Sequence, residues 1–313
     1  MSKPGNDTVE GDSRPAWVSI PTEARNPRTV EIDLRSTVEV LRAINAEDQA
    51  VPAAVAKILP QLAELVDVSV AAIRSGGRVH YVGAGTSGRL AVLDAAELIP
   101  TFSIPDDLFL AHHAGGEPAF RAAVEDAEDD SPGGAAEIER DAAAGDVVIG
   151  IAASGRTPYV LGALAAARGL GAYTALVSSN PSAPANADVD VAVAVETGPE
   201  AIAGSTRMKA GTAQKLVLTA FSTSVMIRLG HTYSNLMISM RATNAKLRGR
   251  NVRILAEATG RPDEECSDAL SSANGELKVA LVSLLSGVDI AGTRVALSHA
   301  DGYVRVALDA LRS

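Results

Sequence analysis

A glycine-rich loop between a short β-branched run and an apolar-periodic run limits what this chain can fold into more than any other feature. The loop, Gly83-Ala-Gly-Thr-Ser-Gly88, joins residues 79–82, which predict a strand, to residues 87–98, which predict a helix. The first turn of such a helix has free backbone N–H groups and the positive end of the helix dipole. The stretch therefore predicts a cradle for an anion.

The loop matches the G-x-G-x-x-G pattern of dinucleotide-binding proteins, so a nicotinamide or flavin site is one interpretation. That pattern also needs an acidic residue that ends the following strand, whereas Asp106 and Asp107 precede the next apolar run. The hydroxyl groups of Thr86 and Ser87 suit a phosphate monoester better, since they can donate hydrogen bonds to it. We favour a phosphate over a dinucleotide, and a purely structural turn is the further alternative.

Short apolar runs alternate with helical patterns through the middle of the chain. This alternation is typical of a parallel α/β sheet, in which ligands bind at the carboxyl ends of the strands. The expected strands are residues 79–82, 108–111, 146–152, 172–177 and 189–195, and the expected helices between them are residues 87–98, 117–128 and 158–169.

Helical patterns also lie on both sides of this region. One helix is expected from about Ile32, and a second from Glu47 toward Ile73. After the sheet, helices are expected at residues 210–229, 234–253, 263–273, 275–286 and 288–311, the last broken at Gly292 or Gly302. The chain thus divides into a disordered tail at residues 1–21, N-terminal helices at residues 22–77, an α/β domain at residues 78–235 and a C-terminal helical region at residues 236–313.

Two further loops repeat the features of the first. Residues 146–158 form a strand followed by a loop that carries Ser154, Gly155 and Thr157, with Pro158 early in the next helix. A third stretch near Ser205 is rich in hydroxyl groups and cations and leads into a long helix. Helix capping explains one such loop, but several in one sheet favour phosphate binding. The available cations are Arg89, Arg156, Arg207 and Lys209.

Carboxyl groups near these loops could provide acid and base chemistry. Glu97 precedes Leu98-Ile-Pro100, and an apolar environment would raise the pKa of its carboxyl group toward a useful range. The alternative is an ordinary surface pair with Asp94, one turn earlier. Residues 117–128 are expected to place Glu117, Glu125 and Glu128 on one helix, and their composition favours a solvated acidic surface.

Composition excludes several classes of function. A net charge of −10 and a pI near 5.0 argue against nucleic acid or an anionic membrane as a partner. No apolar run is long enough to span a membrane, and the single cysteine, Cys266, excludes an intramolecular disulfide, so the cytoplasm is the expected location. The histidines have no metal-ligand spacing, and adjacent His112 and His113 should point to opposite faces of a strand.

The most distinctive sequence lies around these loops. It comprises Gly83-Ala-Gly-Thr-Ser-Gly-Arg-Leu90 with Leu93-Asp-Ala-Ala-Glu97, Ala114-Gly-Gly-Glu117 with Ala127-Glu-Asp129, Gly150-Ile-Ala-Ala-Ser-Gly-Arg-Thr-Pro-Tyr159, and Ser205-Thr-Arg-Met-Lys-Ala-Gly-Thr-Ala-Gln-Lys-Leu216. Together these blocks resemble the N-acetylmuramic acid 6-phosphate etherase family, and the resemblance runs from about Thr22 to the C-terminus.

The resemblance implies a sugar isomerase (SIS) domain, which is a flavodoxin-like parallel sheet with helices on both sides, and a small C-terminal helical domain. It also implies a cytoplasmic homodimer that cleaves the D-lactyl ether of a phosphosugar without a metal or redox cofactor. Glu97 matches the family's catalytic proton donor and Glu128 its second catalytic glutamate. Substrate contacts are expected from Gly85, Thr86, Ser87, Ser154, Gly155, Thr157 and Ser205.

Two other functions share this kind of domain. A phosphosugar-binding regulatory protein, as represented by the glucokinase regulatory protein, needs the cradle but has no need for both glutamates. A sugar-phosphate isomerase also removes a proton next to a carbonyl group. Release of lactate distinguishes the etherase from both.

Overall fold

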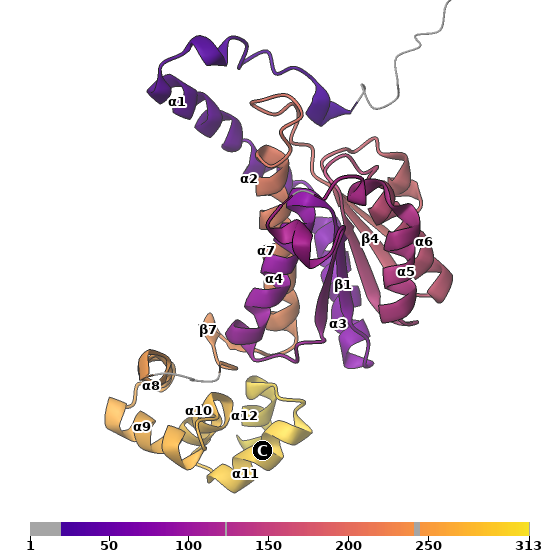
Figure 1. Cartoon of the computed structure of the whole chain (residues 1–313). Helices are drawn as coiled ribbons and strands as arrows, with labels where there is room; N and C mark the ends of the chain where they lie inside the picture. Colours follow the sequence, from indigo (N-terminus) through magenta and orange to yellow (C-terminus); the bar gives the residue numbers. More distant parts are fainter. Residues whose placement is uncertain (1–19, 123, 241–244, 313) are drawn as a thin grey trace, which may run out of the picture.

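A five-stranded parallel sheet forms the centre of the computed structural model, which describes residues 20–122, 124–240 and 245–312 (Figure 1). The strand order is β2-β1-β3-β4-β5. All five strands lie where the sequence predicts them, at β1 (Val79–Gly83), β2 (Phe109–His113), β3 (Val147–Ile151), β4 (Tyr173–Ser178) and β5 (Val191–Ala194).

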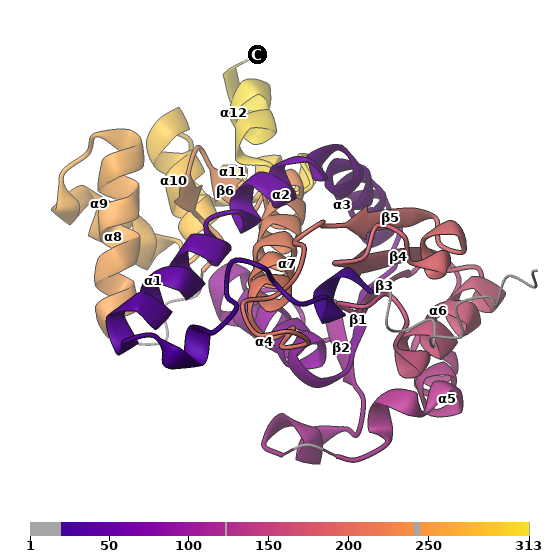
Figure 2. The same cartoon turned by 90° about the horizontal axis from the view of Figure 1, so that it is seen from above.

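Both faces of the sheet are covered by helices (Figures 1 and 2). One face packs against α3 (Leu59–Arg74), α4 (Gly85–Phe102) and α7 (Lys209–Arg228), and the other against α5 (Ser131–Asp141) and α6 (Pro158–Leu170). Burial on both faces explains why the strands read as continuous apolar runs. This architecture confirms the predicted α/β fold with a flanked parallel sheet.

From residue 20 onward, the N-terminal region contains the short 3-10 helices η2 (Pro21–Glu23) and η3 (Ile32–Leu34), followed by α1 (Thr37–Asp48) and α2 (Val51–Ala56). The expected long second helix is wrong in detail, because Glu47 belongs to α1 and the rest is divided into α2 and α3. Pro52 and Pro60 stand in the first turns of α2 and α3, where proline is tolerated. In Figure 1 the segment that contains α1 extends away from the sheet. The predicted disordered tail lies outside the described residues except at Ile20 and Pro21.

The C-terminal helices form a second core of their own. They are α8 (Ala245–Thr259), α9 (Asp263–Ser272), α10 (Leu277–Ser286), α11 (Ile290–His299) and α12 (Val304–Arg312). The predicted break at Gly302 is confirmed by its φ of +76°, whereas α11 continues through Gly292. The expected helix over residues 234–253 is wrong at its start, because Ser234, with φ +51°, turns a hairpin of β6 (Thr232–Tyr233) and β7 (Leu236–Met237).

No single described helix is both long and apolar enough to cross a membrane, although α10 and α11, bent by 107°, pass that test as a pair.

The helix expected over residues 117–128 is also wrong. Two short 3-10 helices stand there instead, η4 (Glu117–Phe120) and η5 (Ala127–Asp129). Asp126 has a left-handed φ of +59°, which interrupts a helix, and the Asp130 carboxylate accepts a 2.8 Å hydrogen bond from the Gly133 N–H to begin α5. Glu117, Glu125 and Glu128 therefore do not share a helix face.

Close packing of α5 on α6 positions the segment that carries Glu128. A Cβ atom at Gly134 on α5 would lie 2.0 Å from the Tyr159 carbonyl oxygen, whereas one at Gly169 on α6 would meet nothing within 4 Å. We expect Gly134→Ala to lower the free energy of unfolding by about 3 kcal/mol. Gly169→Ala should leave it unchanged or raise it by up to about 1 kcal/mol. Urea denaturation of both variants measures the difference, and equal effects would contradict this packing.

Candidate active site

Two glycine- and hydroxyl-containing loops meet at the carboxyl edge of the sheet. Strands β1 and β3 are neighbours, with Gly83 beside Ile151 in the parallel register. The loop after β1 leads into α4, and the loop after β3 leads into α6. Both helices therefore present their N-terminal N–H groups at the same edge, where an anion can be bound.

The glycines of the first loop allow helix α4 to approach the strand. A Cβ atom at Gly83 would lie 2.7 Å from the Gly88 nitrogen, and one at Gly88 would lie 2.6 Å from the Gly83 oxygen. Gly85 is exposed and has a left-handed φ of +54°. Close helix–strand packing and one turn thus explain the three glycines of the G-x-G-x-x-G match, and the match does not by itself indicate that a dinucleotide binds.

The hydroxyl groups of this loop differ in their environments. Thr86 is half-buried and lies close to Gly211 in the first turn of α7. A Cβ atom added at Gly211 would be 3.4 Å from Cγ2 of Thr86. Ser87 is buried and donates a 3.0 Å hydrogen bond to Oε1 of Gln214. Gln214 is also buried, and its Nε2 group has no partner within the described parts of the chain. Gln214 is a residue of this site that sequence reasoning missed.

The second loop is held by backbone contacts. Ser154 Oγ accepts a hydrogen bond from the Arg156 N–H at 3.1 Å, and Asn180 Nδ2 donates to the Ser154 carbonyl at 3.0 Å. Gly155 has a φ of +66°, and a Cβ there would lie 2.5 Å from the Ala183 Cβ. Thr157 stands at the N-cap of α6 without a side-chain capping bond. Its hydroxyl group is therefore available to a ligand at this helix end.

The third hydroxyl-rich stretch is arranged differently from the prediction. Ser205 lies in a half-buried turn before α7, but the N-terminus of α7 already binds a carboxylate of the protein. Buried Glu200 accepts 2.8 and 2.9 Å hydrogen bonds from the N–H groups of Lys209 and Ala210. Burial raises the pKa of Glu200, and these N–H groups oppose that effect.

Two of the expected cations are engaged within the protein. Lys209 is buried and forms a 2.7 Å ion pair with Glu47 of α1, which also pairs with Arg28 at 2.5 Å. Arg89 donates to the carbonyl oxygens of Ala119 and Phe120 at 2.6 and 3.2 Å, which ties the first turns of α4 to η4. Exposed Arg207 precedes α7.

The expected burial of Glu97 is wrong for the single chain. Glu97 lies on the exposed face of α4, and Asp94 is the carboxyl group of this helix that is removed from water. Asp94 accepts hydrogen bonds from Tyr81 and Ser222 at 3.0 and 3.2 Å, and burial raises its pKa. The two carboxyl groups therefore do not form the surface pair that was the alternative. Glu128 is exposed in η5.

A buried chain of histidines runs beneath the Glu128 segment. Asp146 Oδ2 lies 3.1 Å from His80 Nε2, and His80 Nδ1 lies 3.0 Å from His112 Nε2. Burial lowers the pKa of His80 to about 4, so His80 is neutral and donates to Asp146. His80 then accepts from His112, whose Nδ1 atom is 3.5 Å from Glu137. Within the described residues, no group of three or more His, Cys, Asp or Glu side chains could hold a metal ion.

This histidine chain ends at a hollow of about 530 Å³ beside the Glu128 segment. Glu137 and Tyr159 both line the hollow, and the Tyr159 hydroxyl donates a 2.8 Å hydrogen bond to the Glu137 carboxylate. His113 instead faces α4, with Nε2 3.3 Å from the Gly85 oxygen. The prediction that His112 and His113 point to opposite faces is confirmed.

Comparison with known proteins decides the family. The N-acetylmuramic acid 6-phosphate etherase of Thermobifida fusca is 60% identical over 269 residues, which cover 86% of this chain and 88% of that protein. The protein of the same name from Serratia proteamaculans is 49% identical over 288 residues, covering 92% of this chain and 97% of its own. The chain belongs to the N-acetylmuramic acid 6-phosphate etherase family.

A family model also matches part of the α/β domain. Residues 61–168 match the family model described as the glucokinase regulatory protein N-terminal SIS domain. A phosphoheptose isomerase from Francisella tularensis aligns with a TM-score of 0.49 and 17% identity, over 61% of this chain and 98% of that one. The etherases of Thermobifida fusca and Serratia proteamaculans confirm the resemblance stated from the sequence blocks, whereas the roles of individual residues stay predictions.

The ion pair at the start of α7 predicts a pH dependence of stability. The hydrogen bond from Arg28 is the largest cause that lowers the pKa of Glu47, from 4.5 to about 2. Because the folded-state pKa is lowered, this contribution is fully present above about pH 4.5 and is lost as the pH falls toward 2.

Between pH 6 and pH 3, the free energy of unfolding of the wild type should fall by about 2 kcal/mol more than that of Glu47→Gln. The exposed control Glu139→Gln should keep the wild-type slope. Urea denaturation at both pH values measures the slopes, and parallel slopes for wild type and Glu47→Gln would exclude this role of Glu47.

Proposed function

We propose that this chain cleaves the D-lactyl ether of N-acetylmuramic acid 6-phosphate to give N-acetylglucosamine 6-phosphate and D-lactate, in the recycling of cell-wall amino sugar. The observation that carries the proposal is 60% identity to an etherase of that name over most of the chain. Two hydroxyl-bearing helix N-termini at one edge of the sheet supply the donors that a sugar phosphate requires. Because a phosphorylated sugar does not cross a membrane unaided, we place the reaction in the cytoplasm.

The phosphate binds at the N-termini of α4 and α6 in this proposal. Gly85 and Gly155 allow the backbone to approach it, and Thr86, Ser87, Ser154, Thr157 and Ser205 supply hydroxyl groups. Gln214 adds the unpartnered Nε2 group behind Ser87. The N-terminal N–H groups of α7 do not bind the phosphate in this proposal, since Glu200 already accepts hydrogen bonds from them.

Elimination followed by hydration is the reaction that suits two carboxyl groups. In the open-chain sugar the C2 proton is acidic because it is adjacent to the aldehyde, and a carboxylate base removes it. The C3–O bond then breaks, and a carboxylic acid protonates the departing lactate oxygen. Water adds across the C2–C3 double bond, with hydroxide at C3 and a proton at C2. We assign Glu97 as the proton donor and Glu128 as the second catalytic glutamate.

The position of Glu97 along α4 suggests that its side chain acts in the active site of a second copy of the chain. Twelve residues separate Gly85 from Glu97, which is about 18 Å at 1.5 Å per residue and farther than one hexose phosphate extends. Leu93 and Ile99, on either side of Glu97, are 53% and 40% exposed. The stripe Leu34, Val38 and Leu41 is more exposed still, at 77%, 50% and 61%. Such apolar faces support a homodimer, in which Glu97 becomes buried.

Lactate release from the muramic acid phosphate tests the activity. We expect Glu97→Gln and Glu128→Gln each to lower kcat by about 10²–10⁴-fold while the substrate still binds. The exposed control Glu139→Gln should release lactate at the wild-type rate. Binding of the phosphosugar without lactate release by the wild type would instead support a regulatory protein, and an aldose–ketose product would support an isomerase.

Mixing the two inactive variants tests whether the site is shared. If Glu97 of one copy and Glu128 of the other form one site, each mixed dimer has one intact site. After subunit exchange, an equal mixture should then recover about a quarter of the wild-type rate. If both glutamates act within one chain, every site of the mixed dimer carries a defect and the mixture stays inactive. Analytical ultracentrifugation of the same samples measures the oligomeric state.

A further inference from the structure

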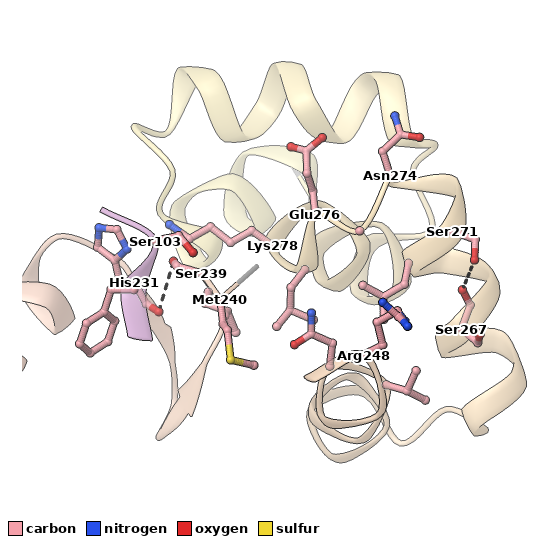
Figure 3. A pocket seen from close by; sticks show the side chains of 17 residues that line it. Ser103, His231, Ser239, Met240, Arg248, Ser267, Ser271, Asn274, Glu276 and Lys278 are labelled. Atoms are coloured by element: carbon pink, nitrogen blue, oxygen red, sulfur yellow. Dashed lines mark hydrogen bonds between the residues drawn. The ribbon is translucent and has the colours of Figure 1, made fainter. Parts of the chain in front are cut away.

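A cavity of about 930 Å³ lies between the α/β domain and the C-terminal helices. Its walls come from the end of α4, the segments after α7 and β7, and helices α8, α9 and α10 (Figure 3). Phe102 and Ser103 line it, so it lies at the opposite end of α4 from the phosphate cradle. Its size is that of a site for a small molecule.

Buried polar atoms of two side chains in this cavity lack hydrogen-bond partners among the described residues. Asn251 is 1% exposed, and neither its Oδ1 nor its Nδ2 atom has a hydrogen-bond partner among the residues that the structure describes. The Nδ1 atom of His231 is also buried and has no hydrogen-bond partner among the described residues. Buried polar groups are nearly always hydrogen-bonded, so an amide that lines a cavity with both atoms unpaired indicates a missing ligand.

The charges around the cavity favour an anion. Arg248 and Lys278 line it together with one acidic residue, Glu276, which is paired with Arg294 at 2.6 Å. No carboxylate of the described ranges lies within ion-pair distance of Lys278, and burial lowers the pKa of its amine. Figure 3 shows Lys278 reaching across the cavity toward Ser103 and His231. Burial lowers the pKa of His231 to about 4, so its ring is neutral.

We propose that this cavity binds a small organic anion, with a carboxylate or phosphate group and further hydroxyl or amide groups, at a site separate from the cradle. Lys278 and Arg248 hold the anionic group. Asn251 pairs with an amide or hydroxyl of the ligand through both of its polar atoms, and Ile238 and Leu270 contact the apolar side. This site involves no reaction step and holds whether or not the chain is an etherase. Since its walls come from both parts of the chain, occupancy stabilises the junction between them.

Methionine methyl groups give separate signals for the two sites. Met240 lines the cavity, whereas Met208 stands at the N-cap of α7 beside the cradle. We would label the five methionines with ¹³C at the methyl carbon and assign each signal by a Met→Leu variant. The intact protein is then titrated separately with D-lactate, N-acetylglucosamine 6-phosphate and inorganic phosphate. We expect a saturable shift of the Met240 signal with at least one organic anion, and the choice of anion distinguishes carboxylate from phosphate.

Matched variants identify the groups that bind. Asn251→Leu and Lys278→Leu should each weaken binding, so that the dissociation constant measured at Met240 rises by roughly tenfold. The titration of the Met208 signal should stay unchanged in both variants. Arg253→Leu, on an exposed position of α8 outside the cavity, should behave as the wild type. The signal of buried Met226 checks that each variant is folded. A Met240 signal unmoved by all three compounds, or dissociation constants equal in all variants, would overturn the proposal.

Discussion

The buried ion pair between Lys209 and Glu47 holds the N-terminal helices to the wall of the site. Lys209 Nζ lies 2.7 Å from Glu47 Oε2, and both side chains are almost fully buried. Removal of one partner from such a pair leaves an uncompensated charge, which costs about 3–5 kcal/mol. Because Lys209 is the first residue of α7, the pair also fixes the turn of α7 that touches Thr86 of the cradle. The cradle therefore depends on a contact between two residues that are 162 positions apart in sequence.

The architecture was predictable because its determinants are local. Each strand is buried on both faces, so it reads as an apolar run between turn residues. The N-termini of α4 and α6 follow these strands directly, and parallel strands place such loops at one edge. The glycines Gly83 and Gly88 were visible as a motif, and in the structure they allow close contact between helix and strand.

Other parts depend on contacts that no local pattern reveals. The spacing of acids in residues 117–128 resembles a helix, but the left-handed Asp126 and the cap formed by Asp130 divide the segment. An apolar sequence around Glu97 does not bury it, because Leu93 and Ile99 are themselves exposed. Gln214 and Asn180 reach the hydroxyl loops across 127 and 26 positions of sequence, so only the fold brings them there.

Glu200 gives the site a built-in counter-anion. Its carboxylate occupies the N-terminus of α7 in the way that a bound phosphate would, and so that helix end is neutralised before any substrate arrives. An anion could therefore bind at this helix end only in place of Glu200, whereas no side chain caps the N-termini of α4 and α6.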